Sequence, residues 1–344
     1  MKTLKDIAKQ CSVSIATVSN ILNNKSNVSK ETKDRVLKVI KESGYKPNYM
    51  ARGLRATKTN TIGLLIDDLT QFSTPMLVDG IMAYLEANNY KSVIENLRFF
   101  SKWKDKWEGN PAYNNAVASS IQQFDAIKVD GIIYVASHCR NIDSIPKNND
   151  IPTAICYAFS KENPIPSVMI NDEKAACEMT EYLIKKGHSN IAVISGSKDN
   201  IHTEKRLLGF KNTLSKNNIS FNSKLICYGD WSFDGGYNAC KELFKTNQKF
   251  TSIFCFNDLM AAGVYKYLRE INLEPGEDIS VAGFDNRFEE SFLRPKLTTM
   301  QIPLFSIGQK SAEIILKKIQ QQDLDNNELY IDCTFIEGES VKGG

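Results

Sequence analysis

The chain has 344 residues, of which 42% are hydrophobic and 24% charged, the composition of an ordinary soluble protein long enough for two or three domains. No stretch approaches the ~20 apolar residues of a membrane helix, and the N-terminus lacks the apolar core of a signal peptide, so we expect a cytoplasmic protein. The eight cysteines and three histidines are scattered, without a Cys-x-x-Cys pair, which predicts free thiols and neither a metal site nor a cofactor.

Three short helices are expected in the first 44 residues. Apolar residues recur at helical spacing in two neighbouring segments, Leu4, Ile7 and Ala8, then Val18, Ile21 and Leu22. Ser14 is a suitable N-cap for the second helix, and Ser29 for a third that Gly44 ends and that turns Val36, Leu37 and Ile40 to one side. Three helices with a polar second helix are typical of a helix-turn-helix, which lays a recognition helix in the DNA major groove.

The charge of this region supports DNA binding. Residues 1–58 hold 13 lysines and arginines against 4 aspartates and glutamates, a net charge of +9, so that the rest of the chain carries −6. Lysine and arginine bind nucleic acid by releasing counterions from its phosphates.

The N-terminal segment resembles the headpiece of lactose-repressor/galactose-repressor (LacI–GalR) transcription regulators. The resemblance lies in Asp6-Ile7-Ala8, Val13-Ser14, residues 16–19, Leu22-Asn23, Val28-Ser29, Arg35-Val36 and residues 44–48 and 51–55. It implies that DNA is contacted by Leu4, Lys5, Ser14, Ile15, Ala16, Thr17, Ser19, Asn20, Asn23, Ser29, Tyr45, Asn48, Ala51, Arg52, Leu54 and Arg55. The alternative is a small helical cap on a metabolic enzyme.

A short hinge follows the headpiece. Pro47 prevents the third helix from continuing, and Asn48 can cap a new one that would be marginal alone. The resemblance implies a hinge helix that inserts Leu54 between base steps of the minor groove, with Arg52 and Arg55 at the backbone or groove edge. The alternative is that Leu54 packs on the body of the protein.

From residue 61 onward, apolar strand-like runs alternate with helical segments. Strands are expected at 61–66, 91–95, 131–135, 153–156, 191–194, 252–256 and 280–284, and helices at 76–88, 173–186, 205–217, 235–245, 258–270 and 305–321. This alternation predicts parallel α/β sheets with helices on both faces. Two such units, joined by a hinge, would close on a ligand at the carboxyl ends of their strands.

The body resembles the same family through segments such as Gly229-Asp230-Trp231, Phe256-Asn257-Asp258 and Gly283-Phe284-Asp285. The resemblance implies an α/β fold, with a helix-turn-helix headpiece (1–46), a hinge and linker (47–60) and a periplasmic-binding-protein-like body (61–344). The body would have two parallel α/β subdomains, about 61–158 plus 286–322 and about 159–285 plus 323–344. The implied effector contacts are Phe72, Ser73, Thr74, Trp107, Tyr157, Arg206, Trp231, Asn257 and Asp285.

Four departures from the family pattern bear on specificity. Asn20 stands where the family mostly has Arg. Since asparagine prefers adenine and arginine prefers guanine, we expect adenine at that operator position. Ile15 and Ala16 could touch a thymine methyl. Tyr157 replaces a common acidic residue, and Ile302 replaces a common Gln. The last departure is an insertion of about a dozen residues between Asn96 and Asp130.

The insertion brings aromatic residues to a strand end that should face the cleft. Its Trp103 and Trp107 alternate with lysines and could stack on a larger sugar, or they could form a satellite core under a loop. We favour stacking slightly, because three interleaved lysines argue against deep burial.

The sequence therefore predicts a sequence-specific DNA-binding regulator, expected to be a repressor of carbohydrate-utilisation genes under the control of a sugar-like effector. Its expected partners are a pseudo-palindromic operator in double-stranded DNA, a carbohydrate and a second copy in a homodimer, with no membrane. The alternatives are a carbohydrate-binding module, a carbohydrate-processing enzyme with a helical extension, or a regulator controlled by a phosphorylated protein. No nucleophile–base pair or phosphate-binding glycine loop supports an enzyme.

Overall fold

The computed structural model describes residues 3–22, 28–44, 58–104, 110–287, 292–324 and 326–344. The chain divides into two compact units, Met1–Thr59 and Asn60–Gly344, which we call the headpiece unit and the body. Each is described by itself. Within the described ranges, no helix combines the length and the apolar character needed to cross a membrane.

The headpiece unit contains the three expected helices, α1 (Leu4–Gln10), α2 (Ile15–Leu22) and α3 (Lys30–Ser43). The predicted caps are confirmed, because the Ser29 hydroxyl accepts a hydrogen bond from Thr32 N and Gly44 ends α3 in the left-handed conformation with φ 61°. Ile7, Val18, Ile21 and Val36 form the core. The prediction that Leu37 shares the face of Val36 is wrong: Leu37 is 41% exposed, because one step along a helix turns the side chain by about 100°.

Two parallel sheets organise the body, and each defines one lobe. The first lobe holds a six-stranded sheet in the order β11-β5-β4-β3-β1-β2, and the second holds a four-stranded sheet in the order β7-β6-β8-β9. The bounds are β1 (Thr61–Ile66), β2 (Lys91–Asn96), β3 (Gly131–Val135), β4 (Thr153–Cys156), β5 (Ser167–Ile170), β6 (Ile191–Ser195), β7 (Ile226–Tyr228), β8 (Ser252–Cys255), β9 (Ser280–Ala282) and β11 (Glu328–Ile331). A small antiparallel pair joins β10 (Thr299–Gln301) to β12 (Thr334–Ile336).

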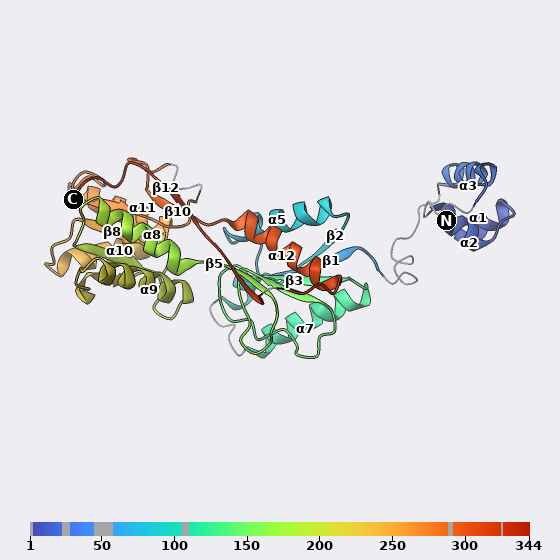
Figure 1. Cartoon of the computed structure of the whole chain (residues 1–344), viewed down its shortest axis with the longest axis horizontal. Helices are drawn as coiled ribbons and strands as arrows, with labels where there is room; N and C mark the ends of the chain where they lie inside the picture. The colour runs from blue at the N-terminus through green and yellow to red at the C-terminus, as the bar shows by residue number, and fades with distance from the viewer. Residues whose placement is uncertain (1–2, 23–27, 45–57, 105–109, 288–291, 325) are drawn as a thin grey trace. The chain divides into compact units, whose positions relative to one another are not determined.

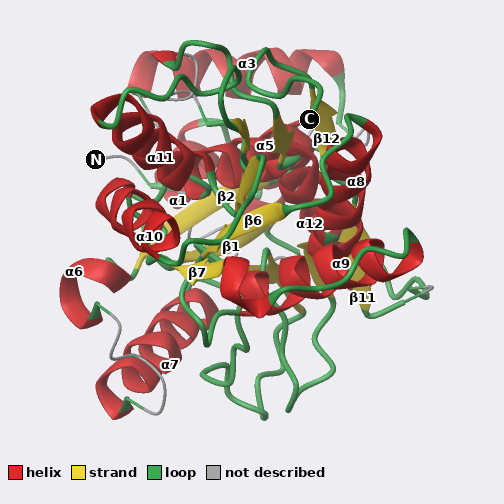
Figure 2. Cartoon of the chain, turned by 90° about the vertical axis from the view of Figure 1, so that its left-hand side faces the viewer, coloured by secondary structure: helices red, strands yellow, loops and turns green. Residues whose placement is uncertain are grey.

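Helices cover both faces of the strands, as Figure 2 shows at the centre of the body. Leu64 of β1 lies in the core cluster of α5 (Thr74–Ala87) and α12 (Leu304–Ile319), whereas its neighbour Leu65 lies in that of α7 (Pro111–Ala126). Successive strand side chains alternate between faces, so both faces of this sheet are apolar and buried. The second lobe carries α8 (Asp172–Lys185), α9 (Ile201–Lys216), η1 (Ser223–Leu225), α10 (Phe233–Lys245) and α11 (Asp258–Glu270).

The expected strands and helices of the body are confirmed, but the subdomain limits differ from the sheets. We assigned residues 159–285 and 323–344 to one subdomain, yet β5 and β11 pair in the first sheet, where Glu328–Ile331 lies beside Ser167–Ile170. The chain passes between lobes at residues 170–172, 302–303 and 332–333 (Figure 1). The region between Asn96 and Asp130, where we expect an insertion of about a dozen residues, contains α6 (Phe99–Trp103) and α7, both in the first lobe.

Candidate functional sites

One side of α2 is available for contact. Val18 and Ile21 turn into the headpiece core, whereas Ile15 is 40% exposed and Ala16 is also exposed. Thr17, Ser19 and Asn20 are partly exposed. The Ser14 hydroxyl accepts a hydrogen bond from Thr17 N at 3.0 Å, so this serine caps α2 as predicted.

The remaining residues expected to contact DNA fall into two groups. Lys5 and Ser29 are exposed, whereas Leu4 is partly buried against the headpiece core. Outside the described residues lie Asn23, Tyr45, Asn48, Ala51, Arg52, Leu54 and Arg55.

Arg206 of α9 is the centre of a buried ionic cluster in the body. Its Nε donates to Asp172 Oδ1 at 2.7 Å, its Nη1 lies 3.9 Å from Asp285 Oδ1, and Nη1 also donates to the Phe256 carbonyl oxygen. The guanidinium carbon lies 3.5 Å from the ring centroid of Phe284. These contacts fix the position of the Arg206 guanidinium, whose five N–H donors lie in one plane.

Asp172 holds a second partner. Its Oδ2 accepts a hydrogen bond from His202 Nδ1 at 2.8 Å, and His202 Nε2 in turn accepts one from the Cys139 backbone N–H at 3.2 Å. Because a backbone N–H can only donate, the histidine carries its proton on Nδ1. Cys139 follows β3 in the first lobe and His202 belongs to α9, so this hydrogen bond joins the two lobes. We call it the cross-lobe hydrogen bond.

The electrostatics of this cluster match its geometry. Burial alone would raise the pKa of Asp172, but His202 and Arg206 outweigh it and hold that pKa below its ordinary value. Burial would lower the pKa of Arg206, but Asp172 and Asp285 raise it. Burial, followed by the charge of Asp172, raises the pKa of Tyr157 well above its usual range. The cluster therefore holds a permanent ion pair beside a neutral phenol.

The structure brings together most of the predicted effector residues. The Trp231 ring lies 5.7 Å from the Arg206 guanidinium, and its carbonyl oxygen accepts a hydrogen bond from Asn257 Nδ2 at 2.9 Å. Trp231 lies so close to Gly196 that a Cβ on the glycine would be 2.0 Å from the indole. The Tyr157 ring packs 5.8 Å from that of His202.

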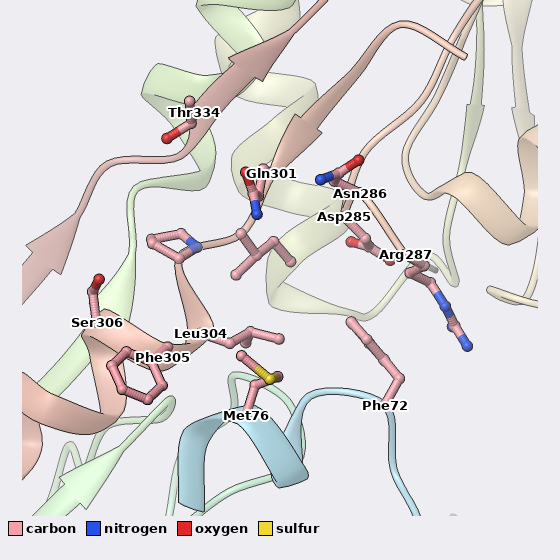
Figure 3. A pocket seen from close by; sticks show the side chains of 12 residues that line it. Phe72, Met76, Asp285, Asn286, Arg287, Gln301, Leu304, Phe305, Ser306 and Thr334 are labelled. Carbon is pink, nitrogen blue, oxygen red and sulfur yellow. The ribbon is translucent and has the colours of Figure 1, made fainter. Parts of the chain in front are cut away.

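A cavity of about 660 Å³ opens beside this cluster (Figure 3). Phe72 and Met76 line it from the first lobe, and Asp285 and Arg287 from the second. The Arg287 guanidinium lies 4.5 Å from the Phe72 ring centroid. Its wall also includes the amide of Gln301 and the hydroxyl of Thr334, as well as Ile302, so the cavity combines apolar walls with hydrogen-bonding groups.

Two predicted effector residues face elsewhere. Ser73 and Thr74 are fully buried at the start of α5, where Ser73 Oγ donates to the Ser137 carbonyl oxygen at 2.6 Å and Thr74 Oγ1 lies 3.5 Å from Ser137 Oγ. Their hydroxyls join α5 to the loop after β3 and neither residue lines the cavity, so their contact with the effector stays a prediction. Trp107 lies outside the described residues.

The packing of Trp103 bears on whether the aromatic residues of this region stack on a sugar or form a satellite core. Trp103 packs edge-on against Phe99 and Tyr113, with ring centroids 6.2 and 5.6 Å apart. Phe99 is fully buried in the second core cluster of the first lobe. Trp103 therefore belongs to a satellite core, the reading that we favoured less.

Asp172 and His202 are the functional candidates that sequence reasoning missed. Asp172 begins α8 and His202 stands in the first turn of α9, and neither belongs to a sequence motif that marks a site. Only the fold brings α8, α9 and the loop after β3 together, so no local pattern marked these residues.

Comparisons with known proteins agree with both parts of the chain. A family model described as bacterial regulatory proteins, lacI family, matches residues 3–48. A second, described as periplasmic binding proteins and sugar binding domain of LacI family, matches residues 110–339. The HTH-type transcriptional regulator RegA of Clostridium saccharobutylicum is 31% identical over 341 residues, which cover 98% of this chain and 99% of RegA.

Solved structures show the same fold. The lac repressor dimer bound to operator and the anti-inducer ONPF has a TM-score of 0.83 and 24% identity, with 99% of each chain covered. A LacI family transcriptional regulator from Enterococcus faecium with bound ribose has a TM-score of 0.66 and 26% identity, covering 82% of this chain and 99% of that one.

Proposed function

Because the chain belongs to the LacI family of bacterial regulatory proteins, we propose that it is a transcription regulator that binds a specific DNA sequence and responds to a small carbohydrate. More narrowly, we propose a repressor that acts on DNA in the cytoplasm as a homodimer. Its relatives are transcription regulators, so the chain is not an enzyme. The observation that carries the proposal is one chain that joins a three-helix headpiece to a two-lobed body with a cavity lined by both lobes.

The exposed side of α2 supports DNA recognition. Ile15 and Ala16 can touch a thymine methyl, and Asn20 can read an adenine. The lac repressor structure is a dimer on its operator, and two headpieces on a two-fold axis require a pseudo-palindromic site. The net charge of +9 over residues 1–58 supplies attraction to phosphates.

The cluster around Arg206 supports a polyhydroxylated ligand. Arginine donates, aspartate accepts from two hydroxyls, and asparagine does both. The indole of Trp231 offers an apolar face for the C–H side of a sugar ring. The E. faecium relative was solved with bound ribose, which is a ligand of this class.

The DNA part is tested by footprinting on the region upstream of the chain's own gene. We expect protection related by two-fold symmetry, and affinity that falls on the order of 10³-fold or more between 50 and 200 mM salt if six or more phosphates are contacted. Protection without two-fold symmetry would contradict the dimeric mode of binding.

The effector part is tested by a thermal-shift screen against monosaccharides and oligosaccharides, since a ligand at a hundredfold excess over its dissociation constant adds about 2.7 kcal/mol. Asp285→Asn should bind the operator but lose the response to the sugar that the screen identifies. The substitution keeps the size of the side chain and suits a residue whose φ is 114°. If the variant loses operator binding while folded, the cleft is misplaced.

A further inference from the structure

The cavity of about 660 Å³ beside the Arg206 cluster has two walls of different chemistry (Figure 3). The first-lobe side, which we call the apolar wall, carries side chains from the beginnings of α5 and α12: Phe72, Met76, Leu304 and Phe305. The second-lobe side, which we call the polar wall, carries side chains that follow β9 or belong to the β10–β12 pair: Asp285, Asn286, Arg287, Gln301 and Thr334. A ligand that bridges the lobes therefore meets apolar groups on one side and hydrogen-bonding groups on the other.

The chain covers the apolar wall only in part. Phe72 is 40% exposed and Met76 is 47% exposed, although both are large apolar side chains. Exposed apolar surface that lines a concave site marks the place of an apolar group of a ligand. A sugar ring alone fits this wall poorly, because its hydroxyls would lose their hydrogen bonds to water without gaining others.

The polar wall suits a neutral, hydroxylated group. The side chains of Asn286, Gln301 and Thr334 form no hydrogen bond with the described part of the chain, so their amides and hydroxyl can donate to and accept from a ligand. The charged side chains of the cavity are one acid, Asp285, and one base, Arg287. Their charges cancel, so the lining favours neither an anion nor a cation.

We propose that the effector is a neutral glycoside, whose sugar faces the polar wall and whose apolar aglycone packs on the apolar wall. This inference rests on the proposed function and names the class of carbohydrate more narrowly. The volume of the cavity lies within the range of roughly 300–1,000 Å³ for sites that take drug-sized ligands, which leaves room for more than a sugar ring. Because the sugar and the aglycone contact different lobes, the aglycone adds to the affinity only when the lobes close on it.

The test uses isothermal titration calorimetry of the full-length chain with matched phenyl and methyl glycosides, namely the β-D-glucosides, β-D-galactosides, α-D-mannosides and β-D-xylosides. For each sugar that binds, we expect the phenyl glycoside to bind about tenfold more tightly or better, because a buried phenyl ring contributes at least this factor. Phenol, which lacks the sugar, should bind more weakly than the phenyl glycosides.

Met76→Gln places the aglycone on the apolar wall. Glutamine keeps an unbranched side chain that suits a helix, but it is polar, so the ratio of phenyl to methyl affinity should fall by about fourfold or more, the factor for one buried methylene. Met82→Gln is the matched control, since Met82 belongs to the same helix α5 and is 42% exposed, but does not line the cavity. It should leave the ratio unchanged.

The same ratio in Met76→Gln and Met82→Gln would overturn the placement of the aglycone, and phenol that binds as tightly as the phenyl glycosides would overturn the role of the sugar. Equal affinity for the phenyl and methyl members of every bound pair would overturn this inference and leave the proposed carbohydrate response intact. Binding of neither series would overturn both. The DNA part of the proposed function is decided separately by footprinting.

Discussion

Among single residues, Asp172 is predicted to stabilise the body, because its carboxylate is the closer partner of a fully buried arginine. Asp172→Asn keeps the shape of the side chain but leaves Arg206 with Asp285, whose carboxylate is 3.9 Å away. Breaking a buried ion pair by removing one partner costs about 3–5 kcal/mol, and Asp285 places this case near the lower end. Urea unfolding of the body measures the loss.

The matched control is Asp332→Asn. Asp332 pairs with Lys174 on the surface, with side chains 52% and 60% exposed. An exposed pair of this kind contributes about 0–1 kcal/mol. Equal losses from the two substitutions would mean that the Arg206 cluster is solvated and not a buried ion pair.

His138 makes the stability of the body depend on pH. Burial and the positive charge of Arg140 lower the pKa of His138 to about 3, whereas a histidine in the unfolded chain titrates near 6.5. The unfolded state therefore binds more protons between these values, so this contribution is present above pH 6.5 and is lost as the pH falls towards 3.

The size of this effect is at most about 1.4 kcal/mol per pH unit, and less because His138 is only half-buried. Unfolding free energies of His138→Gln and of the unmodified chain at pH 7, 6 and 5 measure it. We expect a flatter dependence in the variant. Parallel curves would show that His138 is protonated equally in both states.

Asn20 is predicted to set one base of the operator. Asn20→Arg should shift the preferred pair at one symmetric pair of positions from A·T towards G·C, with discrimination of about 1–3 kcal/mol. Sites selected from a randomised DNA pool by both proteins measure this. Identical selected sites would exclude Asn20 as a reader of bases.

The sequence located those site residues that belong to recognisable local motifs. Arg206, Trp231 and Asp285 meet in the structure as predicted, because each stands in a short segment with its own pattern. Nothing local showed that the hydroxyls of Ser73 and Thr74 are used by the loop after β3. Contacts between segments that are distant in the sequence determine the surroundings of these two residues.

At the scale of elements, the central strands were predicted well because they are continuous apolar runs. β5 and β11 were missed, and the subdomain limits with them. β11 is an edge strand in which exposed and partly buried residues alternate over only Glu328–Ile331, so its pattern is weak. β5 is equally short, and its place is fixed only by pairing with β4 and β11.

The inserted element α6 is expected to stabilise the first lobe. Trp103→Ala should cost about 3 kcal/mol or less, below the full range for a buried aromatic residue, because Trp103 is only partly buried. Thermal unfolding without ligand measures this. Gln122→Ala is the control, since Gln122 is exposed on the neighbouring helix α7. Unchanged stability in Trp103→Ala, with weaker sugar binding, would restore the stacking role.

For the whole molecule, three chain passages connect the lobes, and the hydrogen bond from Cys139 to His202 is one of the contacts between them among the described residues. The passages are covalent, so they allow the lobes to move about them without breaking. The bond from the Cys139 N–H to His202 must break when the lobes separate there. A substitution of His202 should therefore change how easily the lobes separate, which can be measured at the Cys139 N–H.

His202→Phe keeps a ring between Tyr157 and Trp231 but removes both nitrogens. The Cys139 N–H and one oxygen of Asp172 lose their partner, which costs about 1–3 kcal/mol when such groups are buried. If opening at this contact becomes easier by that amount, the Cys139 amide should exchange its hydrogen about 5–150-fold faster. Hydrogen exchange with mass spectrometry on the peptide containing Cys139 measures the rate.

Thr203→Val is the control, because the buried Thr203 hydroxyl has no hydrogen-bond partner among the described residues. Unchanged exchange in His202→Phe would show that the lobes stay together without this bond.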